Sequence, residues 1–359
     1  RQDNLRKSYL ESHLAAIVNP VCQQGLVLSI VDRAMPVESL ARQECRDFLD
    51  VVRHLPRNSR KRFPKLSFRQ ASELARSEGQ VEVVSAAHAN VNLANFSSFL
   101  NWAVNEELLV RNPMKGLRLP DLVSKRDKRN PFSRKQLERI FNSPLYRGCK
   151  NGERGYAISG GEQPRNARFW IPLIALHTGM RLNEICQLDV VDLRLIDGIE
   201  CFIVTGTSEF DKREKSLKTA ASERLIPVHA ALYRCGFSEF LHERRNTRHA
   251  KLFPELGVGP NGKRSVGFSK WFTQFTRNCG AYEQRTCFHS FRHNFRDELR
   301  AARIEHDVAM WLGGWATSGN SQIAADNYGA GHRVKALSEA IAKLNFEGLD
   351  ISHLELRSK

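Results

Sequence analysis

Arg181 lies in a stretch that is otherwise apolar, and this position restricts what the chain can fold into. The segment HTGMRLNEICQLDVVDLR, residues 177–194, places the arginine directly after a Gly-Met pair. Its apolar neighbours are Leu176, Leu182, Ile185 and Leu188. A guanidinium group that is buried without an anionic partner is costly. The position therefore predicts either a salt bridge, with Glu184 or Asp189 as the partner, or an anionic ligand.

The charge of the chain favours a polyanionic partner. The 359 residues suffice for two compact domains, and 55 Lys and Arg against 39 Asp and Glu give a formal net charge of +16. Such a field attracts phosphate backbones, so nucleic acid is the first candidate. No stretch approaches the roughly 20 apolar residues that a membrane span requires. The eight cysteines are scattered without CxxC pairs, which predicts neither a disulfide framework nor a zinc site and favours a reducing, cytosolic setting.

The first 120 residues predict a small helical domain. In VNLANFSSFLNWAVNEELL, residues 91–109, one helical stripe is apolar: Leu93, Phe96, Leu100, Ala103, Val104 and Leu108. Residues 52–69 carry seven Lys and Arg, two prolines and no acidic residue, which favours a basic loop on a phosphate backbone. A solvated charge run is the alternative. The candidate phosphate contacts are Arg57, Arg60, Lys61 and Arg62 in this segment, and Lys125 and Arg126 farther along.

A proline-rich, basic stretch at 110–136 predicts a linker, which we place at 121–130, before a second domain at 131–359. The second domain is expected to be mainly helical, beginning with a helix over 133–141 for which Ser133 is the N-cap. Two strands are expected, at 198–206 and 224–229. Further helices are predicted over 169–179, 265–278, 288–302, 305–314 and 334–346. A Gly-rich surface insertion at 147–168 has no predicted role.

A small set of residues indicates phosphate chemistry. HSFR at 289–292 places His289 and Arg292 on one helical face. Two arginines and a histidine form a suitable cradle for a phosphate, whose oxygens accept bidentate hydrogen bonds. Each residue alone has an ordinary alternative, Arg181 as a salt-bridge partner and His289 as a satisfied core side chain. Near the carboxyl end Tyr328 precedes Gly329, and alone it would be taken for a packing residue.

The motifs HTGMRLNEI, LKTAASERLIP, HSFRH, LGGW and NYG occur in the order and approximate spacing of the tyrosine recombinase (phage integrase) family. The resemblance spans residues 130–346, and the preceding helical domain is similar to that family's core-binding domain. It implies a mainly α fold with a small antiparallel β-sheet (α+β), in which a SAM-like core-binding domain and a catalytic domain close around DNA like a clamp.

The resemblance also implies roles for individual residues. Arg181 and Arg292 resemble the two arginines that grip the scissile phosphate, and Glu184 resembles the acidic residue that orients the first of them. His289 resembles the HxxR histidine, a proton acceptor and phosphate donor. Tyr328 resembles the nucleophile, whose phenol attacks the phosphate and leaves a 3′-phosphotyrosine as the 5′ hydroxyl departs. Neither a metal nor ATP is implied.

Two further positions carry alternatives. Lys218 resembles the hairpin lysine that protonates the departing 5′ oxygen, because KTAASERLIP matches the K-T-x-x-S-x-R-x-I-P run. Lys212 and Lys215 lie on the same loop and are alternative candidates for this role. Lys218 as an ordinary solvated loop lysine is a further alternative. Many members have a histidine where this chain has Trp315. Tryptophan is a known replacement that donates its indole N–H to the phosphate, and a plain core residue is the alternative.

The implied partners are double-stranded DNA attachment sites, with a homotetramer on DNA and a monomer or dimer when free, in the cytoplasm of a bacterial cell or phage-infected host. The function is then integration or excision of a mobile element. A type IB topoisomerase-like enzyme and a catalytically silent DNA-binding protein are the rivals. The tail helix docks either on a neighbouring protomer or in cis. The sequence begins at Arg1 rather than Met, so the presence of an arm-binding module upstream of Arg1 is left as an open alternative.

Overall fold

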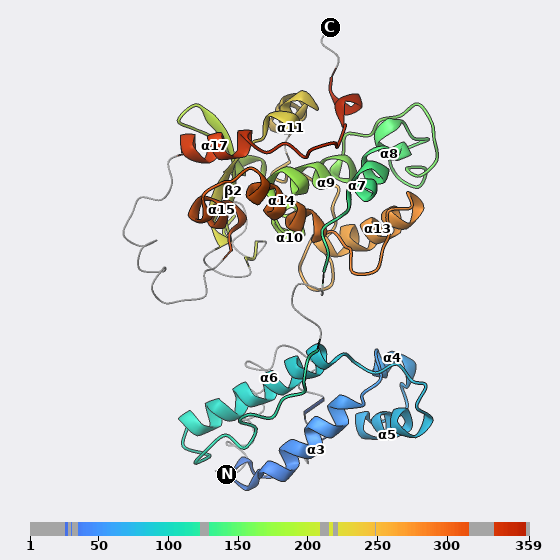
Figure 1. The fold of residues 1–359 in the computed structure, drawn as a ribbon, viewed down its shortest axis with the longest axis vertical. Coiled ribbons are helices and arrows are strands. Elements are labelled where there is room, and N and C mark those ends of the chain that lie inside the picture. The colour runs from blue at the N-terminus through green and yellow to red at the C-terminus, as the bar shows by residue number, and fades with distance from the viewer. Residues whose placement is uncertain are drawn as a thin grey trace. The chain divides into compact units, whose positions relative to one another are not determined.

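The computed structural model describes residues 26, 27, 30, 35–122, 129–208, 215–217, 222–247, 249–315 and 334–356. The chain divides into two compact units, residues 1–124 and residues 125–359, and each unit has its own hydrophobic core (Figure 1). The fold is mainly α-helical with a small antiparallel sheet. In the described part of the chain no helix is long and apolar enough to cross a membrane.

The described elements of the first unit are helical. They are η1 (Val37–Ser39), α3 (Arg42–Arg53), α4 (Ser59–Arg62), α5 (Phe68–Glu78) and α6 (Ala86–Asn105). Helix α3 packs against α5 and α6. The stripe predicted for α6 is confirmed at Leu93, Phe96, Leu100 and Ala103, which are buried, whereas Val104 is partly buried and the helix ends before Leu108.

The prediction of a loop over 52–69 was wrong in part. Helix α4 lies in the middle of this segment, and α5 begins at Phe68, one residue before the segment ends. The two prolines do not prevent these helices, because Pro56 precedes α4 and Pro64 lies between α4 and α5, where no helical N–H is required. The segment therefore contains the end of α3, the short helix α4 and the start of α5, with a turn on each side of α4.

The second unit contains the remaining described helices. They are α7 (Arg134–Phe141), α8 (Pro144–Arg147), α9 (Ala167–Thr178), α10 (Leu182–Cys186), η3 (Val190–Asp192), α11 (Ala230–Arg234), α12 (Phe237–Asn246), α13 (Ser265–Asn278), α14 (Ser290–Ala301), α15 (His306–Gly313), α17 (Val334–Ala342) and η5 (Ser352–Leu354). Ser133 caps α7 as predicted, since its hydroxyl accepts a hydrogen bond from Gln136 N (3.3 Å). Helix α9 is buried on every face, as an apolar sequence requires, and packs against α10, α11 and α14 (Figure 1).

The sheet has three antiparallel strands in the order β1-β2-β3. These are β1 (Leu193–Ile196), β2 (Ile199–Val204) and β3 (Arg224–Pro227), and Val204 pairs with Arg224 in the register. The two predicted strands are confirmed as β2 and β3. Strand β1 was missed because it has only four residues, too few for a clear strand signal in the sequence, and only the first of them is fully buried. The signal that was available is the Asp197-Gly198 pair, whose residues both have positive φ (49° and 77°), as a type I′ hairpin turn of two residues requires.

The predicted insertion at 147–168 is partly a core element. Cys149 forms isolated β-bridges with Ser159 and Glu162, and the side chains of Cys149 and Tyr156 are buried. The Tyr156 ring lies 5.5 Å from the ring of Trp271 on α13. The stretch is therefore a compact excursion that packs on α13.

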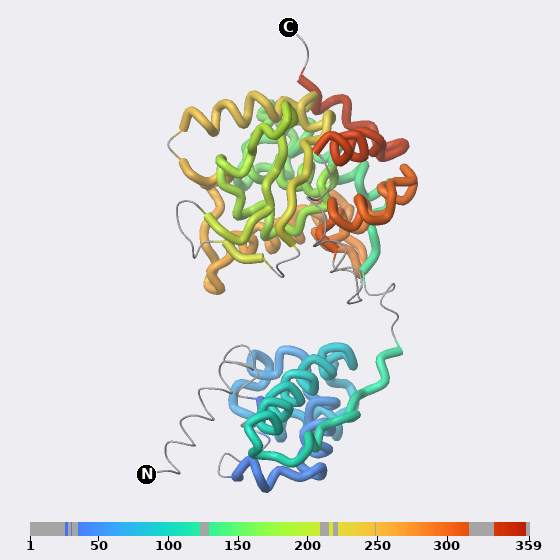
Figure 2. Tube along the Cα trace, turned by 90° about the vertical axis from the view of Figure 1, so that its left-hand side faces the viewer, coloured from blue at the N-terminus to red at the C-terminus, as the bar shows by residue number. Residues whose placement is uncertain are grey.

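The carboxyl-terminal segment packs on its own unit. Helix α17 lies against β2, β3 and α15, and its residues Val334, Leu337, Ala340 and Ile341 are buried. Farther along, Leu356 N donates to Arg234 O (2.9 Å). Figure 2 shows this segment, in red, along one side of the second unit. In this single chain the described tail therefore buries its apolar residues against the unit to which it belongs.

Candidate active site

Arg181 stands at the start of α10, directly after the turn that ends α9. The turn requires glycine at position 179, since its φ is 61° and an added Cβ would lie 2.3 Å from the Phe295 ring. Arg181 N donates to Glu184 Oε2 (2.9 Å), and Arg181 Nη1 donates to Glu184 Oε1 (2.6 Å). Of the two carboxylates considered for Arg181, the structure therefore selects Glu184.

Glu184 is shared with a second arginine that the sequence analysis did not select. Arg224 Nη2 donates to Glu184 Oε2 (3.0 Å), and the side chains of both residues are at most 3% exposed. Ser222 joins the two arginines, since Arg181 Nη1 donates to its hydroxyl (3.0 Å) and Arg224 Nη1 to its carbonyl (2.8 Å). Burial alone would raise the pKa of Glu184, but the charge of Arg224 and the hydrogen bonds from both arginines hold it below its ordinary value.

Arg224 also fixes the end of α15. Its Nε donates to Leu312 O (2.9 Å), and an added Cβ at Gly314 would lie 2.9 Å from its guanidinium group. A signal for this residue existed in LKTAASERLIP, where an arginine stands in a strand that is otherwise apolar. Such an arginine needs an anionic partner, but the sequence does not say which one.

Arg292 and Trp315 lie together beside this turn. Arg292, on α14, is buried, and its Nη1 donates to Gly179 O (2.7 Å), two residues before Arg181. Its guanidinium carbon lies 4.7 Å from the centre of the Trp315 ring, a cation–π contact. Burial and the charges of Arg224 and Arg181 lower the pKa of Arg292 to about 9. The charged form of Arg292 is therefore destabilised in the free protein, and a nearby anion would stabilise it.

His289 stands at the amino end of α14 and is half-buried. Burial and nearby positive charges lower its pKa to about 4, so the imidazole of the free protein is neutral at pH 7. Arg292 and Arg181 are both among those charges. The structure thus brings Arg181, His289, Arg292 and Trp315 together from three separate parts of the chain. We call these four residues with Arg224 and Glu184 the arginine cluster.

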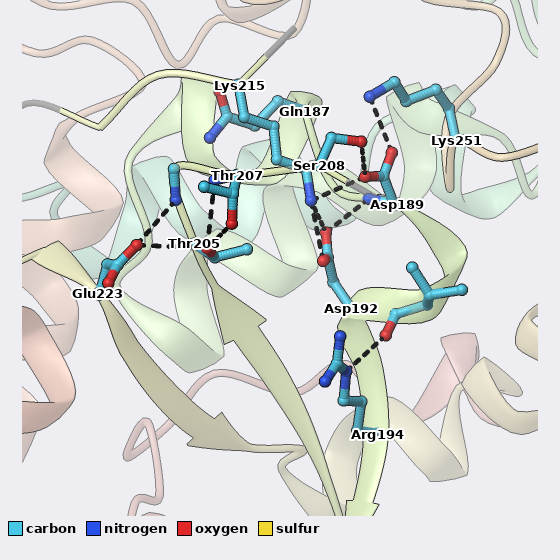
Figure 3. Close-up of polar contacts among 12 residues, drawn as sticks. Gln187, Asp189, Asp192, Arg194, Thr205, Thr207, Ser208, Lys215, Glu223 and Lys251 are labelled. Carbon is cyan, nitrogen blue, oxygen red and sulfur yellow. Dashed lines mark hydrogen bonds and ion pairs between the residues drawn. The ribbon is translucent and has the colours of Figure 1, made fainter. Parts of the chain in front are cut away.

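Four of the selected residues cannot be placed. Lys218, Tyr328, Lys125 and Arg126 lie outside the described residues, as does the alternative Lys212. The other alternative, Lys215, is described and is buried between Asp189 and Asp192 (Figure 3). Lys215 is thus part of a separate group of charges.

The basic residues selected in the first unit are exposed. Arg57 precedes α4, and Arg60, Lys61 and Arg62 lie on it. Arg57 forms an ion pair with Glu82, and the guanidinium carbon of Arg60 lies 5.1 Å from the centre of the Phe68 ring. Their exposure leaves the charged ends accessible to an anionic surface.

The arginine cluster holds three guanidinium groups and one carboxylate, an excess of positive charge that suits an oxyanion. Planar guanidinium groups bind phosphate oxygens in pairs, and the neutral imidazole can accept a proton. Among the described residues no group of three or more His, Cys, Asp and Glu is arranged to hold a metal ion.

Comparisons with known proteins identify similar domains. Residues 163–328 match the model of the phage integrase family. No curated protein matches the chain in sequence. The structure is similar to the Tn1549 transposon integrase in complex with circular intermediate DNA, at 15% identity over 92% of this chain and 97% of that one, with a TM-score of 0.55. It is also similar to a lambda integrase dimer bound to a core site, at 15% identity over 88% and 97% of the two chains, with a TM-score of 0.50. At these identities the likeness shows the fold.

Proposed function

We propose that this chain, whose residues 163–328 match the model of the phage integrase family, is a tyrosine recombinase that cleaves and rejoins DNA strands through a 3′-phosphotyrosine intermediate. The observation that carries the proposal is the convergence of Arg181, His289, Arg292 and Trp315 around an excess of positive charge. A scissile phosphate is the anion whose chemistry fits this set.

In the proposed complex, Arg181 and Arg292 bind the non-bridging oxygens of the phosphate. Glu184 compensates part of the charge of Arg181 and Arg224, so the phosphate meets arginines that are already oriented. Preorganised donors of this kind contribute a few kcal/mol each to the transition state, because charge on the phosphorane oxygens grows as the nucleophile attacks. The indole N–H of Trp315 supplies a further hydrogen bond.

In the proposed reaction, the Tyr328 phenol oxygen forms a bond to phosphorus and the bond from phosphorus to the 5′ oxygen breaks. His289, neutral at pH 7, accepts the phenol proton, and Lys218 gives a proton to the 5′ oxygen. The 3′-phosphotyrosine conserves the energy of the phosphodiester. A 5′ hydroxyl from another strand then attacks it and releases the tyrosine.

The proposed partner is double-stranded DNA that carries attachment sites. The similar Tn1549 structure is a complex with DNA, and the lambda structure is a dimer on a core site. In this chain Arg57, Arg60, Lys61 and Arg62 would contact the phosphate backbone, and Lys125 and Arg126 of the predicted linker would do the same. Strand exchange between two duplexes requires four active sites, so we propose a homotetramer on DNA, acting in the cytoplasm.

The test is covalent capture. Nicked duplexes of randomised sequence are incubated with the full chain, and the DNA that stays attached to denatured protein is selected and sequenced. The wild type and the control Tyr282→Phe, which alters an exposed tyrosine of the same unit, should form the adduct. Tyr328→Phe should not. No adduct with the wild type would favour the silent DNA-binding protein, and relaxation of supercoils without joining of two duplexes would favour the topoisomerase-like enzyme.

A further inference from the structure

A buried group of charges outside the arginine cluster holds the base of the β2–β3 hairpin (Figure 3). Lys215 Nζ donates to Asp192 Oδ1 (2.9 Å) and Oδ2 (2.6 Å) and lies 2.8 Å from Asp189 Oδ2. Lys251 Nζ lies 2.8 Å from Asp189 Oδ1. Two ammonium groups thus face two carboxylates, the balance that buried charges require.

Asp189 connects the two ends of the hairpin segment. Ser208 follows β2 in the chain, and its hydroxyl donates a hydrogen bond to Asp189 Oδ2 (2.7 Å). The same oxygen contacts Lys215, which lies in the part of the chain that leads back to β3. Nearer the strands, Glu223 Oε1 accepts a hydrogen bond from Gly206 N (3.3 Å). Asp189 Oδ2 therefore holds both ends of the segment that joins β2 to β3, at Ser208 and at Lys215.

The groups that hold the hairpin belong to the same segment as Arg181. Helix α10 begins after Arg181 and ends at Cys186, and Oε1 of its C-cap residue Gln187 accepts a hydrogen bond from Ser216 N (3.1 Å). Asp189 and Asp192 follow directly, and Asp189 N donates to Asp192 Oδ2 (2.7 Å). The chain that returns toward β3 is therefore attached, at Lys215 and Ser216, to one continuous segment that starts at the arginine cluster.

We propose that Lys215 is a positioning residue for strand cleavage: it fixes the returning arm of the hairpin against the α10 segment, ahead of Ser222, whose hydroxyl accepts a hydrogen bond from Arg181 Nη1. The inference rests on the proposed role of Lys218, which stands three residues farther along the chain. Lys215 itself is not the proton donor, because its ammonium group is enclosed by carboxylates and its side chain is 2% exposed.

The test separates the delivery of a proton from every other step. Two nicked duplexes of one sequence, obtained by covalent capture on the wild type, differ only at the scissile phosphate, where sulfur replaces the bridging 5′ oxygen in one of them. A thiolate departs without a proton donor because a thiol is a far stronger acid than an alcohol. A variant that misplaces the donor is therefore slow on the oxygen substrate and close to normal on the sulfur substrate.

For Lys215→Met we expect cleavage of the oxygen substrate to fall roughly 10- to 100-fold, as misplacement of a catalytic group does. On the sulfur substrate the rate should stay within about threefold of the wild type, since no general acid is needed there. Lys251→Met is the matched control, because it removes a charge from the same carboxylate but lies outside the hairpin. Lys251→Met should lower thermal stability, but it should not slow cleavage of the oxygen substrate more than cleavage of the sulfur substrate.

A second variant covers the case in which Lys215→Met does not fold. Ser208→Ala removes one hydrogen bond to Asp189, keeps both ion pairs, and should show a smaller loss that sulfur also relieves. Equal losses on both substrates, or no loss on either, would overturn the proposal.

Lys218→Ala distinguishes this inference from the proposed function. It should be the slowest variant on the oxygen substrate and recover on the sulfur substrate. If it cleaves the oxygen substrate normally while Lys215→Met needs sulfur, Lys215 is the acid and the positioning role is wrong. If the wild type forms no adduct with any duplex, the proposed function itself fails.

Discussion

Glu184 offers the sharpest test of the arginine cluster, because one buried carboxylate serves two arginines. Glu184→Gln preserves the shape of the side chain and removes its charge. Arg181 and Arg224 then face each other without compensation, and Arg292 lies close enough for Glu184 to influence its pKa. The side chain of Glu184 is 3% exposed, so solvent does little to relieve the repulsion. Removing one partner of a buried ion pair costs about 3–5 kcal/mol.

We expect a loss near the lower limit, about 3 kcal/mol, because the glutamine oxygen can still accept one hydrogen bond. In a unit of this size each kcal/mol lowers Tm by roughly 2–4 °C, so the predicted decrease is about 6–12 °C. The measurement is thermal unfolding of the full chain followed by tryptophan fluorescence. Inorganic phosphate should restore more stability to the variant than to the wild type, because an anion replaces the missing charge.

The matched control is Glu138→Gln. Glu138 pairs with Arg134 at 3.0 Å, but the two side chains are 41% and 64% exposed, so this substitution should cost less than about 0.5 kcal/mol. Phosphate should affect this control and the wild type equally. If Glu184→Gln loses less than about 1 kcal/mol, or gains no more from phosphate than the control does, the reasoning about the cluster is refuted.

Three further predictions follow from pKa values and backbone geometry. The negative charge of bound DNA should raise the pKa of His289 from about 4, so the protein should take up a proton when it binds DNA at pH 5. Calorimetry in buffers of different ionisation enthalpy detects this proton uptake. A binding heat that does not depend on the buffer would contradict the prediction. Burial lowers the pKa of His177 to about 3, so the unfolded chain binds the extra proton, and the free energy of unfolding should fall by about 1.4 kcal/mol per pH unit from the unfolded pKa near 6.5 down toward 3. His177→Gln should reduce that slope in denaturant titrations, and an unchanged slope would exclude the assignment. Gly179→Ala should cost about 1–3 kcal/mol more than Gly198→Ala, since both have positive φ but only the first would meet the Phe295 ring; equal losses in Tm would show that the ring gives way.

The sequence predicted most reliably what neighbouring residues determine. Helix α13 begins and ends where its apolar periodicity does, and Ser133 caps α7 through a contact three residues away. The pairing of Arg181 with Glu184 is of the same kind, since the two residues lie within one helical turn. Such features depend on local spacing, which a single sequence displays directly.

Contacts between distant segments were less accessible. Nothing in the sequence shows that Arg224 reaches Glu184, 40 residues earlier, or that Lys215 is buried between Asp189 and Asp192 rather than presented on its loop. Lys215 looked equivalent to Lys218 for that reason. Strand β1 illustrates the same limit, because its partner β2 defines it more than its own four residues do.

The course of the tail after α17 affects how subunits can exchange parts. Between Val334 and Leu356 the tail buries side chains in its own core, and it is attached near its end by the bond from Leu356 N to Arg234 O. If a protomer exchanged this segment with a neighbour, the segment would make similar contacts there, so the exchanged state would be about as stable as the original one. The exchange would be slow, because the contacts in its own unit must break first. Differently tagged preparations that swapped tails would therefore mix slowly, whereas subunits that associate through other surfaces would equilibrate within the time of a binding measurement.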